Sequence, residues 1–182
     1  MKTPEEIVKF VRTEKDKIWK GLYWRSSVIG QQLKNLEKHK KNAIVFLSVE
    51  TPVRLCQVTN TAFHKLQSHI NNPVYKQYRI PKKSGGFREI MAPGKELKKV
   101  QKSLNYYMQA YYLYIKPAEV NGFVINPRYI KVKCGIVENA NAHVNKKYIL
   151  NIDLKDFFPS ISAKRVKKLF SSDIFLFNEQ IA

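Results

Sequence analysis

Acidic residues are scarce in this sequence of 182 residues. Only 14 Asp and Glu stand against 33 Lys and Arg, which leaves a formal net charge of +19. So basic a balance excludes an ordinary soluble enzyme of mixed surface charge and points to a polyanionic partner. Aromatic residues make up 12% of the chain, including ten Tyr and ten Phe. Cations and aromatic rings together favour a nucleic-acid binder that contacts phosphates and stacks on bases.

Long apolar runs are also absent. No stretch is long enough to span a bilayer, and no signal-peptide pattern follows Met1. These absences weaken the competing interpretation, a basic protein of a membrane surface, and we expect no membrane partner. Cysteine is limited to Cys56 and Cys134, which are far apart and lack metal-ligand spacing. We expect reduced thiols in a cytoplasmic protein.

One stretch combines a predicted core strand with carboxylates. Residues 148–154 are mostly branched and apolar, which is typical of a strand covered on both faces. Asp153 lies inside this run, Asp156 follows three residues later, and Phe157 and Phe158 come next. A carboxylate placed there suits a divalent metal that handles a phosphate substrate. A strand-end Asp held by backbone donors, followed by a capping or turn Asp, explains the same pattern equally well.

A β-hairpin is predicted upstream of this stretch. Val74–Ile80 and Phe87–Met91 have strand character, and the turn between them contains two consecutive glycines. Lys82 and Lys83 lie in the turn, and Arg88 begins the return strand. Glycine between cations allows a close approach to phosphate. An ordinary solvated hairpin, whose lysines discourage edge pairing, is the alternative.

Apolar residues make up 44% of the chain, enough for the core of one domain or slightly more. The clearest helix runs from Gly94 to Lys116, and one side of its first half is lined by lysines. These lysines form either a nucleic-acid track or a solvated face, and the net charge favours the track. They are Lys95, Lys98, Lys99 and Lys102. The tyrosine-rich second half of the helix is predicted to pack rather than to stack on bases.

Helices are also predicted near both ends of the chain. Thr3 has the spacing of a capping residue at the start of an N-terminal helix. Ser162 is a predicted cap for a short basic helix over residues 163–170, with Val166 and Phe170 directed inward.

The run Asn-Ile-Asp-Leu-Lys-Asp-Phe-Phe-Pro-Ser-Ile at residues 151–161 resembles the first catalytic motif of reverse transcriptases, in the form found in retron and group II intron enzymes. The resemblance implies that Asp153 is the first metal-binding carboxylate of the palm, with the backbone carbonyl of Leu154 as a second ligand. It implies that Phe158 lies against the sugar of the incoming nucleotide and disfavours a 2′-hydroxyl. The nucleotide-binding residues implied by this motif are Asp156, Phe157 and Phe158.

Two further motifs resemble the same family. Ile-Pro-Lys-Lys-Ser-Gly-Gly-Phe-Arg-Glu-Ile resembles the fingers hairpin of bacterial reverse transcriptases. It implies that Arg88 and one of Lys82 or Lys83 hold the triphosphate of the incoming nucleotide. Asn-Ala-Asn-Ala-His at residues 139–143 resembles the N-A-x-x-H motif of retron enzymes in particular.

The retron motif and its neighbourhood carry the predicted RNA contacts. Asn139 and His143 are four residues apart and would share a face if the segment is helical. Both can hydrogen-bond to RNA or to nearby backbone, and a structural role remains as open as direct contact. The resemblance also places Arg128 in a second fingers motif, near the template strand. The lysines from Lys95 to Lys102 complete the predicted template surface.

Polymerases of this type use two Mg2+ ions held by three carboxylates. In the family, the further pair lies in a Tyr-x-Asp-Asp sequence. This chain has four aspartates, none of them adjacent: Asp16, Asp153, Asp156 and Asp173. We therefore expect a two-metal site that is incomplete in this chain, which covers the fingers and the opening of the palm.

The predicted fold class is α+β, an incomplete right-hand fold. N-terminal helices occupy 1–72, a fingers hairpin and long amphipathic helix 73–147, and the first palm strand and helix 148–182. The implied function is copying of a structured noncoding RNA into DNA, with phage defence as a role of the family. The implied partners are RNA template and primer, nascent DNA, deoxynucleotide triphosphates and an accessory or effector protein. The alternatives are a group II intron maturase or another bacterial reverse transcriptase, and a non-catalytic RNA-binding module.

Overall fold

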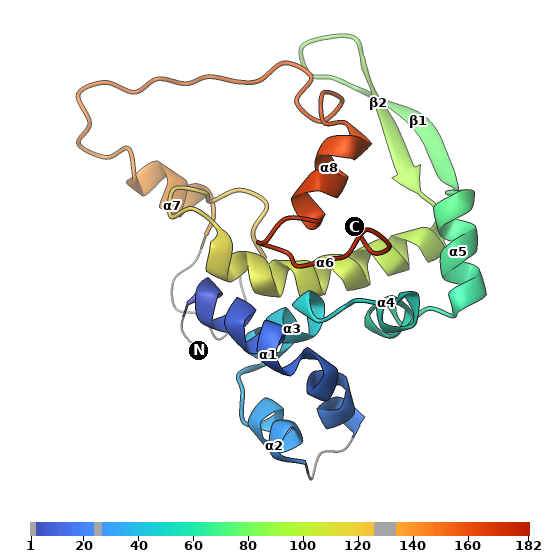
Figure 1. The fold of residues 1–182 in the computed structure, drawn as a ribbon. Helices are drawn as coiled ribbons and strands as arrows, with labels where there is room; N and C mark the ends of the chain where they lie inside the picture. The colour runs from blue at the N-terminus through green and yellow to red at the C-terminus, as the bar shows by residue number, and fades with distance from the viewer. Residues whose placement is uncertain (1–2, 24–26, 126–133) are drawn as a thin grey trace.

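The computed structural model describes residues 3–23, 27–125 and 134–182. The described residues form eight helices and one two-stranded antiparallel sheet (Figure 1), in agreement with the predicted α+β class. The helices are α1 (Pro4–Tyr23), α2 (Val28–Lys34), α3 (Lys38–Leu47), α4 (Pro52–Thr59), α5 (Phe63–Asn71), α6 (Lys95–Ile115), α7 (Ile136–Asn141) and α8 (Ala163–Phe170). The strands are β1 (Tyr75–Pro81) and β2 (Phe87–Pro93). None of these helices combines the length and apolar character that crossing a bilayer requires.

The predicted helix caps at both ends of the chain are confirmed. The Thr3 hydroxyl accepts a hydrogen bond from the Glu6 amide at 3.3 Å, which fixes the start of α1. The Ser162 hydroxyl accepts one from the Arg165 amide at 3.3 Å, and α8 then spans the predicted residues. In both cases a side-chain oxygen supplies an acceptor that the first helical turn lacks.

The hydrophobic core surrounds α6, which crosses the centre of Figure 1 between the N-terminal helices on one side and α8 with the C-terminal segment on the other. α3 packs along α6, and its Phe46 is almost fully buried. The Phe46 ring meets Phe175 and Phe177 edge to face, with centroids 6.2 and 5.1 Å apart. Segments from opposite ends of the chain therefore share one core.

The C-terminal segment is also held by polar contacts. Arg12 of α1 donates to Asp173 at 2.8 Å, and the Asn178 side-chain Nδ2 donates to the Glu50 backbone carbonyl at 2.8 Å. The Tyr111 hydroxyl donates to the Ile174 carbonyl at 2.6 Å. These bonds fix the path of the segment over α1, the α3–α4 connection and α6.

The structure corrects the predicted orientation of α8. Phe170 packs inward as predicted, with its ring 4.9 Å from Phe175 and 5.9 Å from Phe177 between centroids. Val166 was expected to be buried, but its side chain is 40% exposed. The reason is that α8 meets the core at its C-terminal end, so the first turns have no layer to cover them.

The segment 148–154 is the main correction to the predicted fold. A buried palm strand was expected there, but the segment has no regular secondary structure, and β1 pairs with β2 alone among the described residues. Its apolar side chains are exposed, with Leu150 82% and Ile152 76% accessible. A strand buried on both faces needs neighbouring strands and covering layers, and the described chain places none against this segment.

Tyr111 offers a test of the core through pH. Burial raises the pKa of its phenol to about 12, from an ordinary value of 10.0. Between these values the unfolded state loses a proton that the folded state retains, so the free energy of unfolding falls as pH rises from about 10 to 12. Below pH 10 this contribution is fully present.

We expect Tyr111→Phe to lower stability at neutral pH by about 1 kcal/mol, because the Ile174 carbonyl loses its donor. The free energy of unfolding of the variant should also fall less than that of the parent between pH 10 and 12. Urea unfolding of both proteins across this range measures the difference and cancels the titration of the other tyrosines. An equal loss of stability in the two proteins over this range would contradict the raised pKa of Tyr111.

Candidate nucleotide and nucleic-acid site

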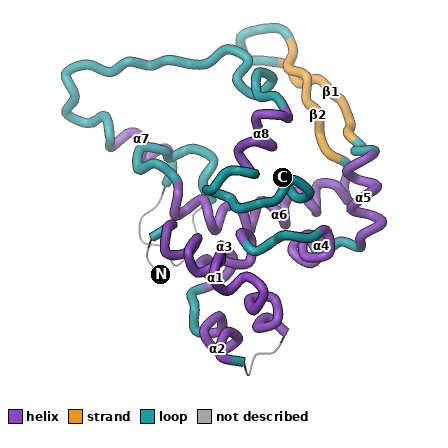
Figure 2. Tube along the Cα trace, in the orientation of Figure 1, coloured by secondary structure: helices purple, strands orange, loops and turns teal. Residues whose placement is uncertain are grey.

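The β1–β2 hairpin projects from the helical core as a ribbon, drawn in orange in Figure 2. Every residue of β1 is exposed. The base of the hairpin is attached to α6 through the Gly94 amide, which donates to the Val74 carbonyl at 2.8 Å, and through Gln101, which donates to the Tyr75 hydroxyl at 3.3 Å. The hairpin therefore has a fixed base and an accessible tip.

Strand register separates the two arginines of the hairpin. Arg79 lies opposite Glu89, and Arg88 lies opposite Ile80. Because neighbouring residues of a strand point to opposite faces, Arg88 does not share a face with Glu89. Arg79 donates to the Glu89 carboxylate through two nitrogens, at 2.9 and 3.1 Å. Arg88 has no ion pair in the described part of the chain, so its guanidinium is available for an external anion.

The tip of the hairpin is a glycine turn that carries the two lysines. The Lys82 amide donates to the Gly86 carbonyl at 3.0 Å, and the Gly85 amide donates to the Lys82 carbonyl at 3.1 Å. Gly85 and Gly86 have φ angles of 88° and 76°, a left-handed region that other residues enter at a cost. Lys82 and Lys83 are both exposed. The turn thus presents two ammonium groups on the same hairpin as Arg88.

The predicted catalytic segment ends in a tight turn. The Ser160 amide donates to the Asp156 and Phe157 carbonyls, at 3.0 and 3.2 Å, and Asp156 has a left-handed φ of 51°. The rings of Phe157 and Phe158 lie edge to face, 5.4 Å apart. Phe158 also meets the ring of Phe123, from the loop after α6, at 6.3 Å. The structure therefore adds Phe123 to the aromatic pair, a contact between distant segments that the sequence did not indicate.

The carboxylates of Asp153 and Asp156 are exposed, and the Leu154 carbonyl lies between them in sequence. Oxygen donors of this kind are the ligands that Mg2+ prefers. Among the described residues, no group of three or more His, Cys, Asp or Glu converges on one point. Nor does a hydrogen bond, ion pair or ring contact join the hairpin to residues 153–158 within the described chain.

A groove of about 570 Å3 lies between the turn and α8 and includes one predicted nucleotide-binding residue, Phe157. Arg165 and Lys168 of α8 line it beside apolar residues, among them Val166. The sequence marked these cations only as part of a general basic surface. Helical periodicity could have placed both beside the exposed apolar side of α8, but nothing in the motif indicated the groove.

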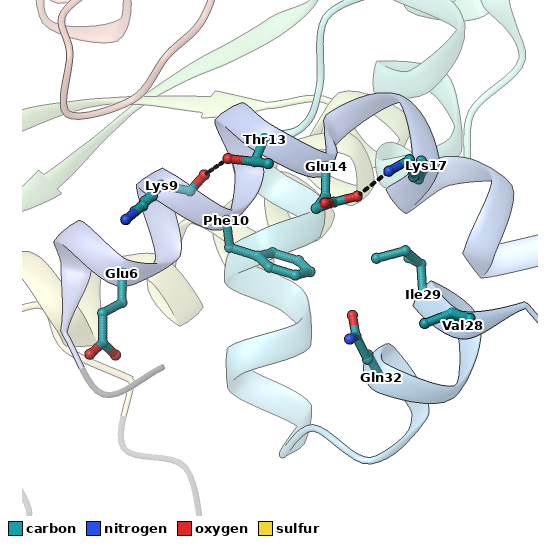
Figure 3. Close-up of a pocket in the computed structure, with 9 residues that line it drawn as sticks. All are labelled: Glu6, Lys9, Phe10, Thr13, Glu14, Lys17, Val28, Ile29 and Gln32. Atoms are coloured by element: carbon teal, nitrogen blue, oxygen red, sulfur yellow. Dashed lines mark hydrogen bonds and ion pairs between the residues drawn. The ribbon is translucent and has the colours of Figure 1, made fainter.

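A second hollow, of about 530 Å3, lies between α1 and α2, where Figure 3 shows the Phe10 ring directed into the space between the helices. Glu14 forms an ion pair with Lys17 at 3.0 Å, and the Thr13 hydroxyl donates to the Lys9 carbonyl at 3.0 Å. None of the sequence-predicted site residues lines this hollow. It therefore takes no part in the candidate site.

The four predicted lysines of α6 are all exposed. Lys99 donates to Glu96 one turn earlier at 2.8 Å. This hydrogen bond, with the positive charges of Lys99, Lys65 and Lys95, holds the pKa of Glu96 below its ordinary value. Lys65 belongs to α5, so cations from two helices act on this single acid of α6.

Comparison with known proteins finds retron reverse transcriptases. The chain is 37% identical to the retron Mx65 reverse transcriptase of Myxococcus xanthus over 95 residues, which are 52% of this chain and 20% of that protein. It is 34% identical to the retron Mx162 reverse transcriptase of the same organism over 96 residues, 52% of this chain and 18% of that protein. This chain is a relative of retron reverse transcriptases.

The retron Ec86 reverse transcriptase of Escherichia coli is 51% identical over 37 residues, 20% of this chain and 12% of that protein. The chain thus spans about a fifth or less of the length of these retron relatives. No family model matches it, and neither does a solved structure.

The retron-type motif lies at the end of α7. Asn139 is in the helix, which ends at Asn141, and His143 lies in the following turn, where its amide donates to the Ala140 carbonyl at 3.0 Å. The two residues are exposed, and they do not share one face of a continuous helix as their spacing would allow. Early helix termination is the cause. Arg128 lies outside the described residues.

Proposed function

We propose that this chain forms the fingers and the opening of the palm of a retron-type RNA-directed DNA polymerase. The relationship to retron reverse transcriptases supports the proposal. The observation that carries it is Arg88, which lies on an exposed basic hairpin and has no ion pair with any residue that the structure describes. The substrates would be deoxynucleotide triphosphates and a structured noncoding RNA, which serves as template for nascent DNA. A cytoplasmic location, an accessory or effector protein and a role in phage defence belong to the same proposal.

The hairpin would bind the triphosphate. A guanidinium grips phosphate oxygens with two parallel N–H donors, and Arg88 has no competing carboxylate on its face of the hairpin. Lys82 or Lys83 would add a second positive charge from the tip. The ammonium group and the guanidinium together would neutralise a polyphosphate and help to orient its reacting end.

The palm segment would bind the metal and the sugar. Asp153 and the Leu154 carbonyl would hold Mg2+, which stabilises charge on the transferring phosphoryl group when bound. Phe158 would lie against the sugar, with Phe157 and Asp156 beside it. The T-shaped contact of Phe158 with Phe123 would restrict the ring's rotation and so help to exclude a 2′-hydroxyl.

A non-catalytic RNA-binding module is the second candidate function. It is favoured by the lysines of α6, which offer a phosphate-binding surface that requires neither Asp153 nor a metal. Template binding through Asn139, His143 and Arg128 is compatible with both candidates. A group II intron maturase or another bacterial reverse transcriptase would share the chemistry of the first candidate.

Arg88→Ala tests the polymerase proposal. The experiment uses a chimaera in which this chain replaces the matching segment of the retron Mx65 reverse transcriptase. We expect kcat/KM for deoxynucleotides to fall by about 10- to 100-fold, since hydrogen bonds to charged groups contribute about 1.5–3 kcal/mol. RNA affinity, measured by fluorescence anisotropy, should change by less than about twofold, because one cation of many is removed.

Arg79→Ala is the matched control. It removes the same side chain from the same hairpin, but from a guanidinium that is already bound to Glu89 on the other face. Its nucleotide kinetics should remain close to those of the parent. Equal damage from both variants would mean that the hairpin was merely destabilised, and a loss confined to RNA affinity in Arg88→Ala would refute the assignment.

A further inference from the structure

Tyr106 differs from the other tyrosines of α6 because it alone among them is exposed. Tyr111 is buried, and Tyr107 and Tyr114 pack against the core, as the sequence predicted for this part of the helix. Tyr106 instead leaves 44% of its surface exposed. An amphipathic ring held at the surface, outside the core, is available for a ligand with an aromatic face.

The Tyr106 ring continues the line of lysines. Residues three or four apart lie on one face of a helix, so Lys95, Lys98, Lys102 and Tyr106 follow each other along α6. The core-facing residues, such as Val100, occupy the opposite side. From Lys95 to Tyr106 the line measures about 16 Å, at about 1.5 Å per residue. That length accommodates the backbone of a few nucleotides of a single strand.

A lysine from another helix holds the ring. The Lys38 ammonium of α3 lies 5.7 Å from the centroid of Tyr106, and the neighbouring Tyr107 ring meets it edge to face at 5.5 Å. Such contacts orient the aromatic side chain, with the ammonium over one face of the ring and 44% of the residue still exposed. Lys38 also carries the positive surface from α6 across to α3. The one acid of α6, Glu96, is already engaged by Lys99.

We propose that Tyr106, with Lys38 and Lys102 beside it, is a stacking site for an unpaired nucleotide of RNA whose backbone follows the lysines of α6. An unpaired base can lay its face on the ring, whereas the bases of a duplex are stacked on each other and present only edges. The ammonium groups would bind the flanking phosphates. The site rests on the RNA-handling role proposed above, and it deepens that role by assigning a single-stranded element to this face.

The test uses the 182-residue chain with a short oligoribonucleotide that carries one 2-aminopurine, alone and annealed to its complement. Tyr106→Leu should bind the single strand about tenfold more weakly, the scale of one base–aromatic stack, and should lose the quenching of 2-aminopurine. Its duplex affinity should stay within about twofold of the parent. Tyr106→Phe should retain single-strand binding, and Lys38→Ala should flatten the salt dependence by about one phosphate contact.

Tyr148→Leu is the matched control, because Tyr148 is also exposed and also carries a lysine, Lys147, over its ring at 5.4 Å. It should leave both affinities unchanged. The stacking site would be overturned if Tyr106→Leu left single-strand affinity unchanged, or if it lowered single-strand and duplex affinity equally. It would also be overturned if Tyr148→Leu lowered single-strand affinity as much as Tyr106→Leu does. Those outcomes leave salt-dependent RNA binding intact, whereas a chain that binds no RNA at any salt concentration would overturn the proposed function as well.

Discussion

Replacing Asp153 by Asn is expected to lower primer extension by about a thousandfold in the chimaera with the retron Mx65 reverse transcriptase. Asn has nearly the same size but carries no charge, and a divalent cation bound by oxygen ligands depends on anionic carboxylates. The metal contributes several kcal/mol to the transition state of phosphoryl transfer. Each 1.36 kcal/mol changes the rate about tenfold, so loss of roughly 4 kcal/mol gives the expected effect.

Asp16→Asn is the control for this prediction, because Asp16 is an exposed aspartate of α1. It should extend primers like the parent. The 182-residue chain by itself is expected to show no extension, even with Mg2+ and deoxynucleotides, since three carboxylates do not converge among its described residues. Extension by this chain alone would show that the metal ligands lie elsewhere, and an active Asp153→Asn chimaera would remove Asp153 from the site.

RNA affinity should fall roughly a thousandfold between about 50 and 200 mM salt, if the chain makes about six phosphate contacts. The reason is the release of counterions from RNA when lysines and arginines neutralise its phosphates. The net charge of +19 provides far more cations than six, and few of the lysines and arginines that the structure describes form ion pairs there. A fluorescence titration at several salt concentrations gives the slope of log affinity against log salt.

Competition by a polyanion and by an uncharged polymer separates charge from shape. Heparin should compete with RNA for the same surface, while an uncharged polysaccharide of similar length should not. A flat salt dependence would remove the phosphate-track argument for α6 and leave the lysines as a solvated face. The polymerase assignment of Asp153 and Arg88 would then depend only on the experiments with the Asp153→Asn and Arg88→Ala variants.

Local features of the fold were predictable from the sequence. The hairpin formed as expected because alternating strand residues and a glycine turn specify it within twenty residues, without help from distant segments. The caps at Thr3 and Ser162 are equally local. The amphipathic pattern of α6 predicted its buried side, since helical periodicity reports directly on burial.

Features that depend on distant contacts could not be predicted. Branched residues at 148–154 indicate burial, but burial requires partner strands, and pattern alone does not reveal whether they are in place. Val166 has helical spacing toward the core, yet α8 touches the core only near Phe170. The exposure of Tyr106 and the contact of Phe123 with Phe158 likewise arise from how separate segments meet.

For the site residues, too, local features were predictable and features that depend on distant contacts were not. Motif resemblance selects Arg88 and Asp153, but only the register shows that Glu89 lies opposite Arg79 and that Arg88 faces Ile80. The groove beside α8, with Arg165 and Lys168, depends on how the preceding turn folds against that helix. Residue type and spacing therefore identify chemistry, while the neighbours of each group follow from tertiary structure.

The closure of the core by the C-terminal segment has a consequence for synthesis on the ribosome. Tyr111 meets Ile174 across 63 residues, and Asn178 meets Glu50 across 128. Synthesis adds about 5–20 residues per second, so Ile174 is made roughly 3 to 13 seconds after Tyr111. During that interval the nascent helices expose the surface of Phe46 and Tyr111 that Phe175 later covers. Chaperone capture of the growing chain should therefore concentrate on lengths between the completion of α6 and the emergence of Phe177.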